Sequence, residues 1–75
     1  MIANKFSILL AERLIKISAV AKETGISRTT LTDLYYRRTK VVTLEVLDKL
    51  CRYLHCSVED IFEFKEDNDR KEDDR

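Results

Sequence analysis

The stretch "ETGISRTTLTDL", residues 23–34, contains the only glycine of a 75-residue chain that has no proline. Glycine adopts positive φ values without steric cost, so it commonly ends a helix. Ser27 follows two positions later, and serine is a preferred residue at the start of a helix. The spacing therefore predicts two short helices joined by the turn "GIS", which is a helix-turn-helix.

The apolar residues around this turn predict how the two helices pack. They form the pattern A-x3-G-x5-L-x2-L, at Ala21, Gly25, Leu31 and Leu34. The small alanine allows the helices a close approach, and the leucines hold the second helix on the core together with Tyr35. Ile26 precedes the cap and Leu31 lies at the fourth helical position, which is the arrangement of a hydrophobic staple.

Three further helices are expected from spacing and caps. A first helix has one apolar face made of Ile2, Phe6, Leu9, Leu10 and Leu14. Ser18 is expected to cap the helix before the glycine, and Thr43 and Ser57 to cap two later helices, the last with Asp60 in a variant of the capping box. The sequence predicts an all-α, five-helix domain over residues 1–64. Residues 65–75, "KEDNDRKEDDR", are expected to be a disordered acidic tail.

The formal net charge is zero, but the charges are segregated. Residues 13–40 carry seven basic and two acidic side chains, a net charge of +5. Residues 43–64 carry five acidic and two basic side chains, a net charge of −3, and residues 65–75 six and four, a net charge of −2. A local basic region attracts an anionic partner whatever the total charge.

Other classes of function find little support in the sequence. Cys51 and His55 are spaced to share a metal on one helix, but Cys56 is the only other ligand of this kind, so we expect buried thiols and no metal. A single histidine and the lack of a glycine-rich phosphate loop argue against an enzyme. No signal peptide or membrane-spanning stretch is apparent. The mixed charge on the polar side of the first helix argues against a helix that lies on a membrane surface. A cytoplasmic protein without a cofactor is expected.

Residues 2–64 resemble the Cro-like, phage-repressor-type helix-turn-helix family, also called the XRE family. The resemblance rests on "ISAVAKETGISRTTLTDLY", a basic loop, and "TLEVLDKLCRYLHCSVEDIFEF". It implies a lambda-repressor-like five-helix fold and a bacterial, phage or mobile-element origin. Members usually carry Asn-Gly after the recognition helix, where this chain has "YYRRTK". Either the helix runs longer here or the loop lacks a left-handed glycine turn.

The exposed face of the helix after Ser27 contains the candidate DNA contacts. A helical wheel and the resemblance together place four residues at base edges: Arg28, Thr29, Thr32 and Asp33. Six others are expected at the DNA backbone, namely Ser18, Ser27, Tyr36, Arg37, Arg38 and Lys40. Ser18 lies at the start of the preceding helix, and the other five flank the recognition helix or lie in the loop that follows it.

Several of these side chains have alternative roles. The Arg28 guanidinium can bind O6 and N7 of a guanine together, or it can contact a phosphate or remain solvated. Asp33 can accept from cytosine N4, pair with Arg37 one turn on, or orient Arg28. Tyr36 can contact a sugar or phosphate, or cover the end of the core.

The sequence predicts a transcriptional regulator that binds double-stranded DNA sequence-specifically, and the expected role is that of a repressor. It is expected to bind a palindromic operator as a homodimer, with half-sites about 34–36 Å apart. No small-molecule ligand or membrane partner is expected. Five apolar residues are candidates for a subunit contact: Ile8, Ile15, Val41, Phe62 and Phe64. The alternative is a helix-turn-helix module that binds protein, in the manner of an antitoxin or adaptor, through the acidic tail.

Overall fold

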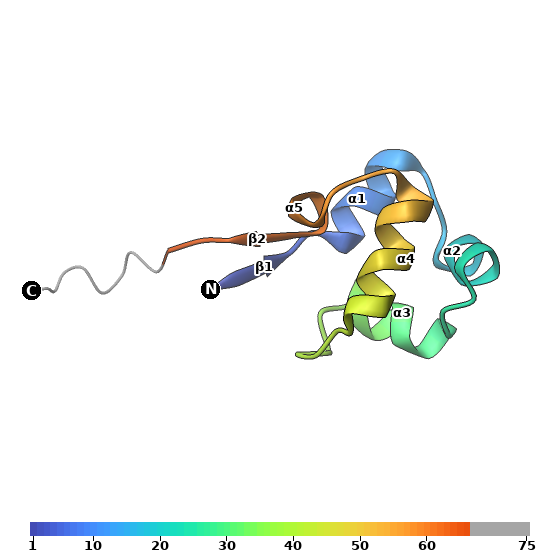
Figure 1. Cartoon of the computed structure of the whole chain (residues 1–75), viewed down its shortest axis with the longest axis horizontal. Helices are drawn as coiled ribbons and strands as arrows, with labels where there is room; N and C mark the ends of the chain where they lie inside the picture. Colours follow the sequence, from blue (N-terminus) through green and yellow to red (C-terminus); the bar gives the residue numbers. More distant parts are fainter. Residues whose placement is uncertain (67–75) are drawn as a thin grey trace, which may run out of the picture.

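The computed structural model describes residues 1–66 as five helices and a two-stranded sheet. In chain order the elements are β1 (Ile2–Asn4), α1 (Phe6–Arg13), α2 (Ile17–Thr24), α3 (Arg28–Tyr35), α4 (Leu44–Leu54), α5 (Val58–Ile61) and β2 (Phe62–Phe64). The helices form one body, and the ribbon of β1 and β2 projects from it (Figure 1). The five predicted helices are confirmed and the domain is mostly helical, but it is not purely α because a small two-stranded sheet is also present.

The N-terminal segment departs most from the prediction. The first helix begins at Phe6, whose backbone N–H donates to Asn4 Oδ1 at 2.9 Å. Ile2 lies instead in β1, opposite Phe64 in antiparallel β2. Ile2 is 61% exposed and Leu14 is 91% exposed, so neither belongs to the buried face of α1. A three-residue strand has too few residues to show its own periodicity, and its partner comes from the other end of the domain.

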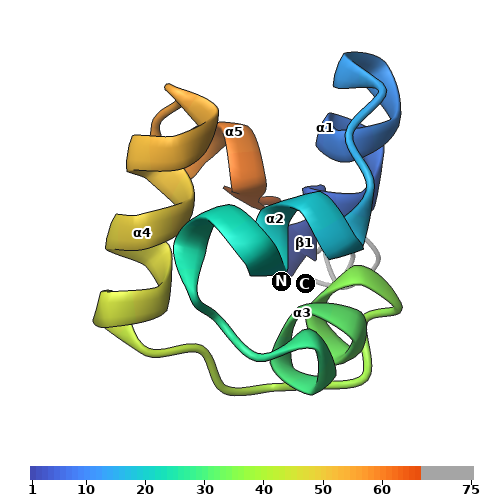
Figure 2. The same cartoon turned by 90° about the vertical axis from the view of Figure 1, so that its right-hand side faces the viewer.

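A single core fills the space between the helices. Figure 2 shows α2 in front, with α1 and α4 on either side of it and α3 below. The buried apolar residues are Phe6, Leu9, Leu10, Val20, Ile26, Leu31, Leu34, Leu50, Leu54 and Ile61. The predicted burial of both α3 leucines is therefore confirmed, and Tyr35 packs against this core at its edge.

Side-chain caps begin α3 and α4 as predicted, and a capping box begins α5. Ser27 Oγ accepts from Thr30 N–H, and Thr43 Oγ1 accepts from Val46 N–H, both at 3.1 Å. The capping box at Ser57 is also present. The predicted cap at Ser18 is wrong: α2 begins at Ile17, and Lys16 precedes it in an extended conformation without a side-chain cap.

Four helix ends pass through the left-handed region, although only one of them has a glycine. The residues are Leu14, Gly25, Arg37 and His55, with φ of 57°, 78°, 59° and 53°. The turn predicted at Gly25 is confirmed. After α3 the helix does not run longer, because Arg37 makes the left-handed turn in place of a glycine.

The two ends of the described chain lie together. Lys65 N–H donates to the Met1 carbonyl at 2.8 Å, and the Met1 ammonium donates to the Lys65 carbonyl at 2.6 Å. The ribbon pairing thus extends one residue beyond the predicted domain boundary at Phe64. Disorder was predicted for residues 65–75; Lys65 is instead paired with Met1, and residues 67–75 lie outside the described residues.

Cys51 and Cys56 are free thiols, half-buried against the core. Cys56 N–H donates to the Cys51 carbonyl at 3.2 Å, which closes the turn after α4. Burial, together with the neighbouring Cys51, raises the pKa of the Cys56 thiol. A raised thiol pKa is typical of structural rather than reactive cysteines. No helix within residues 1–66 has the length and apolar character needed to cross a bilayer.

Candidate nucleic-acid interface

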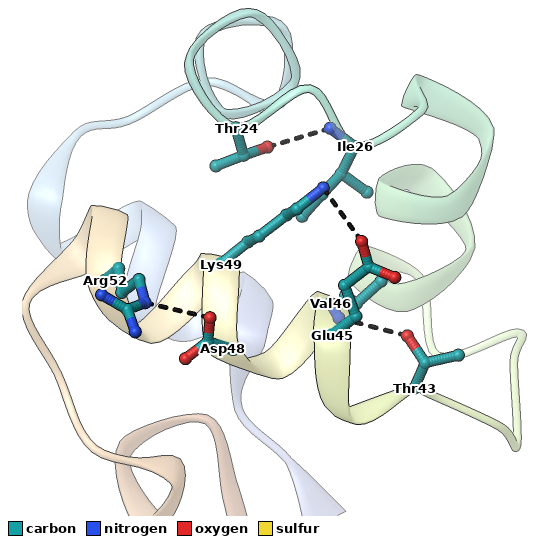
Figure 3. Close-up of polar contacts among 8 residues, drawn as sticks. All are labelled: Thr24, Ile26, Thr43, Glu45, Val46, Asp48, Lys49 and Arg52. Carbon is teal, nitrogen blue, oxygen red and sulfur yellow. Dashed lines mark hydrogen bonds and ion pairs between the residues drawn. The ribbon is translucent and has the colours of Figure 1, made fainter.

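The turn between α2 and α3 is fixed by its own polar groups. Gly25 N–H donates to the Ala21 carbonyl at 2.9 Å, which ends α2. Thr24 Oγ1 donates to the Val20 carbonyl at 2.7 Å. It also accepts from Ile26 N–H at 3.2 Å (Figure 3). Ile26 is thereby directed into the core, where it is 7% exposed. The turn at Gly25 and the burial of Ile26 were predicted from the sequence, whereas the two hydrogen bonds of Thr24 were not.

The first turn of α3 presents its side chains to solvent. Ser27 Oγ accepts from Thr30 N–H and donates to Thr30 Oγ1 at 2.8 Å, so both hydroxyls are engaged in the cap. Arg28 and Thr29 follow the cap and are exposed. Arg28 has no ion-pair partner within the described part of the chain. Its guanidinium is free to meet an external anion or base.

The second turn of α3 holds an acid in a defined pair. Asp33 Oδ1 lies 3.7 Å from Nη1 of Arg38, so the predicted pairing with Arg37 is wrong. The reason is the helix end: Arg37 N–H donates to the Leu34 carbonyl and Arg38 N–H to the Asp33 carbonyl, which turns the chain back. The Arg38 guanidinium also lies 5.1 Å from the centre of the Tyr36 ring. Such cation–π contacts help to hold an exposed arginine in place.

Arg37 faces a different part of the molecule. Its Nε donates to the Asn4 carbonyl at 3.2 Å, and Asn4 Nδ2 donates to the Leu34 carbonyl at 2.9 Å. The basic residues of the predicted backbone contact are thus not one cluster. Arg37 lies against β1, Arg38 lies at Asp33, and Lys40 is exposed in the loop before α4.

The N-terminus of α2 lies beside the first turn of α3. Lys16 precedes the helix, its carbonyl accepts from Val20 N–H at 3.2 Å, and no side chain caps the first turn. A shallow hollow of about 370 Å³ separates this terminus from α3; its lining residues are Ile15, Lys16, Ile17, Ser18, Arg28, Tyr35 and Tyr36. Three predicted contact residues, Ser18, Arg28 and Tyr36, are therefore brought together. Uncapped helical N–H groups with nearby cations attract an anion.

Lys16 is a candidate contact that sequence reasoning missed. It was counted in the basic region, but the expected cap at Ser18 placed the start of α2 two residues too late. The usable signal was the combination of a basic residue with the absence of a capping side chain before "ISAV". Thr30 is also exposed next to Arg28, but its hydroxyl is bonded to Ser27.

The cations on α4 are paired with acidic residues of the same helix, unlike Lys16 and Arg28. Lys49 Nζ lies 3.5 Å from Glu45 Oε2, and Arg52 Nε donates to Asp48 Oδ2 at 2.9 Å (Figure 3). The hollow between α3 and the 39–43 loop, lined by Thr30, Asp33, Leu34, Thr39, Val41, Val42, Thr43 and Val46, has no basic residue in its lining. Two cations without an ion pair within residues 1–66, Lys16 and Arg28, therefore lie on the side of α3 that faces the start of α2.

Comparison with known proteins identifies a family and a relative. Residues 5–67 match the family model described as the Cro/C1-type HTH DNA-binding domain. The chain is also similar to YozG of Bacillus subtilis (strain 168), which is described as an uncharacterized HTH-type transcriptional regulator. The two are 29% identical over 62 residues, which cover 83% of this chain and 74% of the relative.

Proposed function

The chain belongs to the Cro/C1-type helix-turn-helix DNA-binding domain family, and we propose that it is a sequence-specific transcriptional regulator of double-stranded DNA. It acts as a homodimer on a palindromic operator, as a repressor. Occupancy of the major groove excludes other proteins from the same DNA, which makes repression the simplest outcome of binding. The similarity to YozG, which is described as a transcriptional regulator, supports a role in transcriptional regulation.

The observation that carries the proposal is the uncapped N-terminus of α2 beside Arg28. The other helix starts have a side-chain acceptor of the protein itself, at Asn4, Ser27, Thr43 and Ser57. At α2 a DNA phosphate takes that place, bound by the free N–H groups, the Lys16 ammonium and the Ser18 hydroxyl. This contact fixes the depth at which α3 enters the groove.

Base reading then falls to the outer face of α3, where Arg28 and Thr29 are exposed and Thr32 and Asp33 are half-buried. Arg28 donates both arms of its guanidinium to guanine O6 and N7, and Thr29 and Thr32 contact the adjacent base edges. Asp33 accepts from cytosine N4 with its carboxylate partly neutralised by Arg38. That pairing lowers the repulsion between Asp33 and the DNA phosphates.

Backbone contacts come from the residues around α3. At the two ends of the helix, Ser27 offers its backbone N–H, because its hydroxyl is used in the cap, and Tyr36 offers its phenol. Arg38 and Lys40 continue the positive charge into the loop. Arg37 keeps its Nε bond to β1 and offers its remaining N–H groups to a phosphate. Contacts of this kind fix register and supply affinity rather than sequence preference.

The test is selection of a binding site from random duplexes, followed by titration of the selected site. Arg28→Ala is expected to relax preference at one base pair, at a cost of about 1–3 kcal/mol. Lys40→Ala removes an exposed loop cation that is not paired with a base-reading residue, so it should weaken all sequences alike and reduce the slope of log affinity against log salt by about 1. Arg52→Ala, an exposed arginine on α4 that is paired within its own helix, serves as the control and should bind as the wild type does.

Salt dependence separates this proposal from the protein-binding alternative. DNA affinity falls linearly with salt on logarithmic axes because counterions are released, whereas an apolar protein contact responds little. A folded protein that enriches no symmetric motif at moderate salt would contradict specific DNA reading.

A further inference from the structure

The outer edge of β2 is open for backbone pairing. Met1 and Lys65 exchange two backbone hydrogen bonds, and Lys5 N–H donates to the Ile61 carbonyl at 2.7 Å. Hydrogen-bonded and non-bonded pairs alternate along an antiparallel ladder, so Ile2 and Phe64 form a non-bonded pair. The N–H and C=O of Phe64 therefore point away from β1. Within residues 1–66 neither group has a partner.

The ribbon also has one apolar and one charged face. Ile2 and Phe64 lie opposite each other on the same face and are 61% and 67% exposed. Glu63 and Lys65 lie on the other face, where Glu63 Oε1 is 3.7 Å from Lys5 Nζ. An isolated two-stranded ribbon is marginally stable, and an exposed apolar edge is a template for another strand.

We propose that this edge pairs with β2 of a second copy of the chain, antiparallel, about a two-fold axis at Phe64. The product is a four-stranded sheet in the order β1-β2-β2-β1. Phe64 then exchanges both backbone hydrogen bonds with the partner's Phe64, and Glu63 lies opposite the partner's Lys65. The charged face thus carries a row of alternating signs, from Lys5 through Glu63 to the partner's Lys65.

The sequence of the strand selects this register. An axis at Glu63 or at Lys65 places like charges directly opposite each other, which is destabilising. An axis at Phe62 requires a backbone donor that is already used, because Phe62 N–H donates to the Val58 carbonyl. Among axes at residues 62–65, the axis at Phe64 alone combines a free donor and acceptor with opposite charges on both sides.

The resulting dimer leaves the DNA-facing helices uncovered. In the proposed register Phe62 and the partner's Phe62 are four residues apart along the strands, about 13 Å. The two helical bodies therefore lie at opposite ends of the shared sheet. Figure 1 shows the ribbon leaving the body on the side opposite α2. This inference rests on the proposed function in one respect: a palindromic operator requires a dimer with two-fold symmetry, and this interface supplies it.

Charge reversal across the axis tests the pairing, by sedimentation equilibrium of the full chain without DNA. The wild type is expected to dimerise, and Lys65→Glu to weaken the dimer roughly tenfold or more, because both cross-strand pairs become repulsive. Adding Glu63→Lys to Lys65→Glu should restore dimerisation, since the charges are exchanged rather than lost. Circular dichroism should show the same fold in all three proteins.

Three outcomes would overturn the interface: a wild type that stays monomeric, a Lys65→Glu variant that dimerises normally, or a double variant as weak as the single one. None of them decides operator reading, which the DNA selection measures separately. A monomer that still enriches a half-site would leave the proposed DNA contacts standing without this dimer.

Disulfide trapping tests the position of the axis. Phe64→Cys places two thiols at the axis, where paired Cα atoms are about 5.5 Å apart, within disulfide reach. Ile2→Cys is the matched control, similarly exposed but one strand further out, about 14 Å from its copy. Under mild oxidation Phe64→Cys should form a covalent dimer, while Ile2→Cys and the wild type, both with Cys51 and Cys56 intact, should not. Equal trapping of both variants would rule out this register.

Discussion

The helix-turn-helix of α2 and α3 and the ribbon of β1 and β2 contrast in what holds them and in what they expose. Val20 of α2 and Leu31 of α3 are fully buried, while the outer surface of these two helices is polar and cationic. In the ribbon Ile2 and Phe64 remain mostly exposed, and the strands are joined by backbone hydrogen bonds. The first region completes its core within one chain and offers charge to a partner. The second offers apolar surface and a free strand edge, which suits another protein chain.

The largest effect expected from this contrast is on folding. Leu31→Ala removes a side chain with 0% exposure and should lower the free energy of unfolding by about 2–5 kcal/mol. Phe64→Ser alters an exposed residue of the ribbon and should cost about 0.5 kcal/mol or less in the monomer. Urea denaturation at low protein concentration compares the two. Equal losses would mean that the ribbon is as much a part of the folding core as α3 is.

Asn4 joins the two regions, and its removal should have the next largest effect. Asn4→Ala leaves Phe6 N–H and the Leu34 carbonyl without the side-chain partners that they have at 2.9 Å. Loss of a partly buried partner of this kind costs about 1–3 kcal/mol. The melting temperature measures the loss, and amide exchange of β1 relative to α3 shows whether the ribbon opens separately. Unchanged stability would show that water replaces Asn4 at both groups.

Substitutions at two left-handed helix ends should have smaller effects on stability, of opposite sign. Gly25→Ala introduces a side chain at φ 78° with no atom within 4 Å of the new Cβ, so the backbone alone should cost about 1–2 kcal/mol. Leu14→Gly relieves the same conformation at φ 57° in a residue that is 91% exposed, and should stabilise by about 1 kcal/mol or less. Thermal melts of both variants check the signs. Changes of the same sign would contradict a conformational cause.

The smallest effect is a dependence on pH at the start of α5, next to the ribbon. The hydrogen bond from Ser57 N–H to Asp60 Oδ2, 3.0 Å, holds the pKa of Asp60 below its ordinary value. Its contribution is therefore complete above the unfolded pKa of about 3.9 and is lost as the pH falls through the folded value. The difference in melting temperature between the wild type and Asp60→Asn should be constant above about pH 5 and shrink in more acidic solution. A difference that grows on acidification would show that folding raises the pKa of Asp60 instead of lowering it.

The site was predictable where its geometry depends on neighbours in the sequence. The cap at Ser27, the turn at Gly25 and the burial of Leu31 and Leu34 each involve residues within a few positions of one another. Exposure of Arg28 and Thr29 follows from these, because the cap and the buried leucines fix which face of α3 is free. The roles of these residues at DNA stay predictions.

The features that the sequence did not reveal depend on contacts between distant segments or on backbone conformation. Asp33 pairs with Arg38 because the chain turns back at Arg37, whose left-handed conformation has no glycine to announce it. Lys16 became a candidate contact only when the start of α2 was known.

By itself, then, the sequence determined the five helices and the helix-turn-helix, since propensity, caps and apolar spacing act over a few residues. Only the tertiary structure decided the ribbon, because β1 finds its partner at the far end of the domain. Local spacing assigned Ile2 to a helix. The closure of the domain, which brings residues 2–4 beside residues 62–64, made it a strand instead.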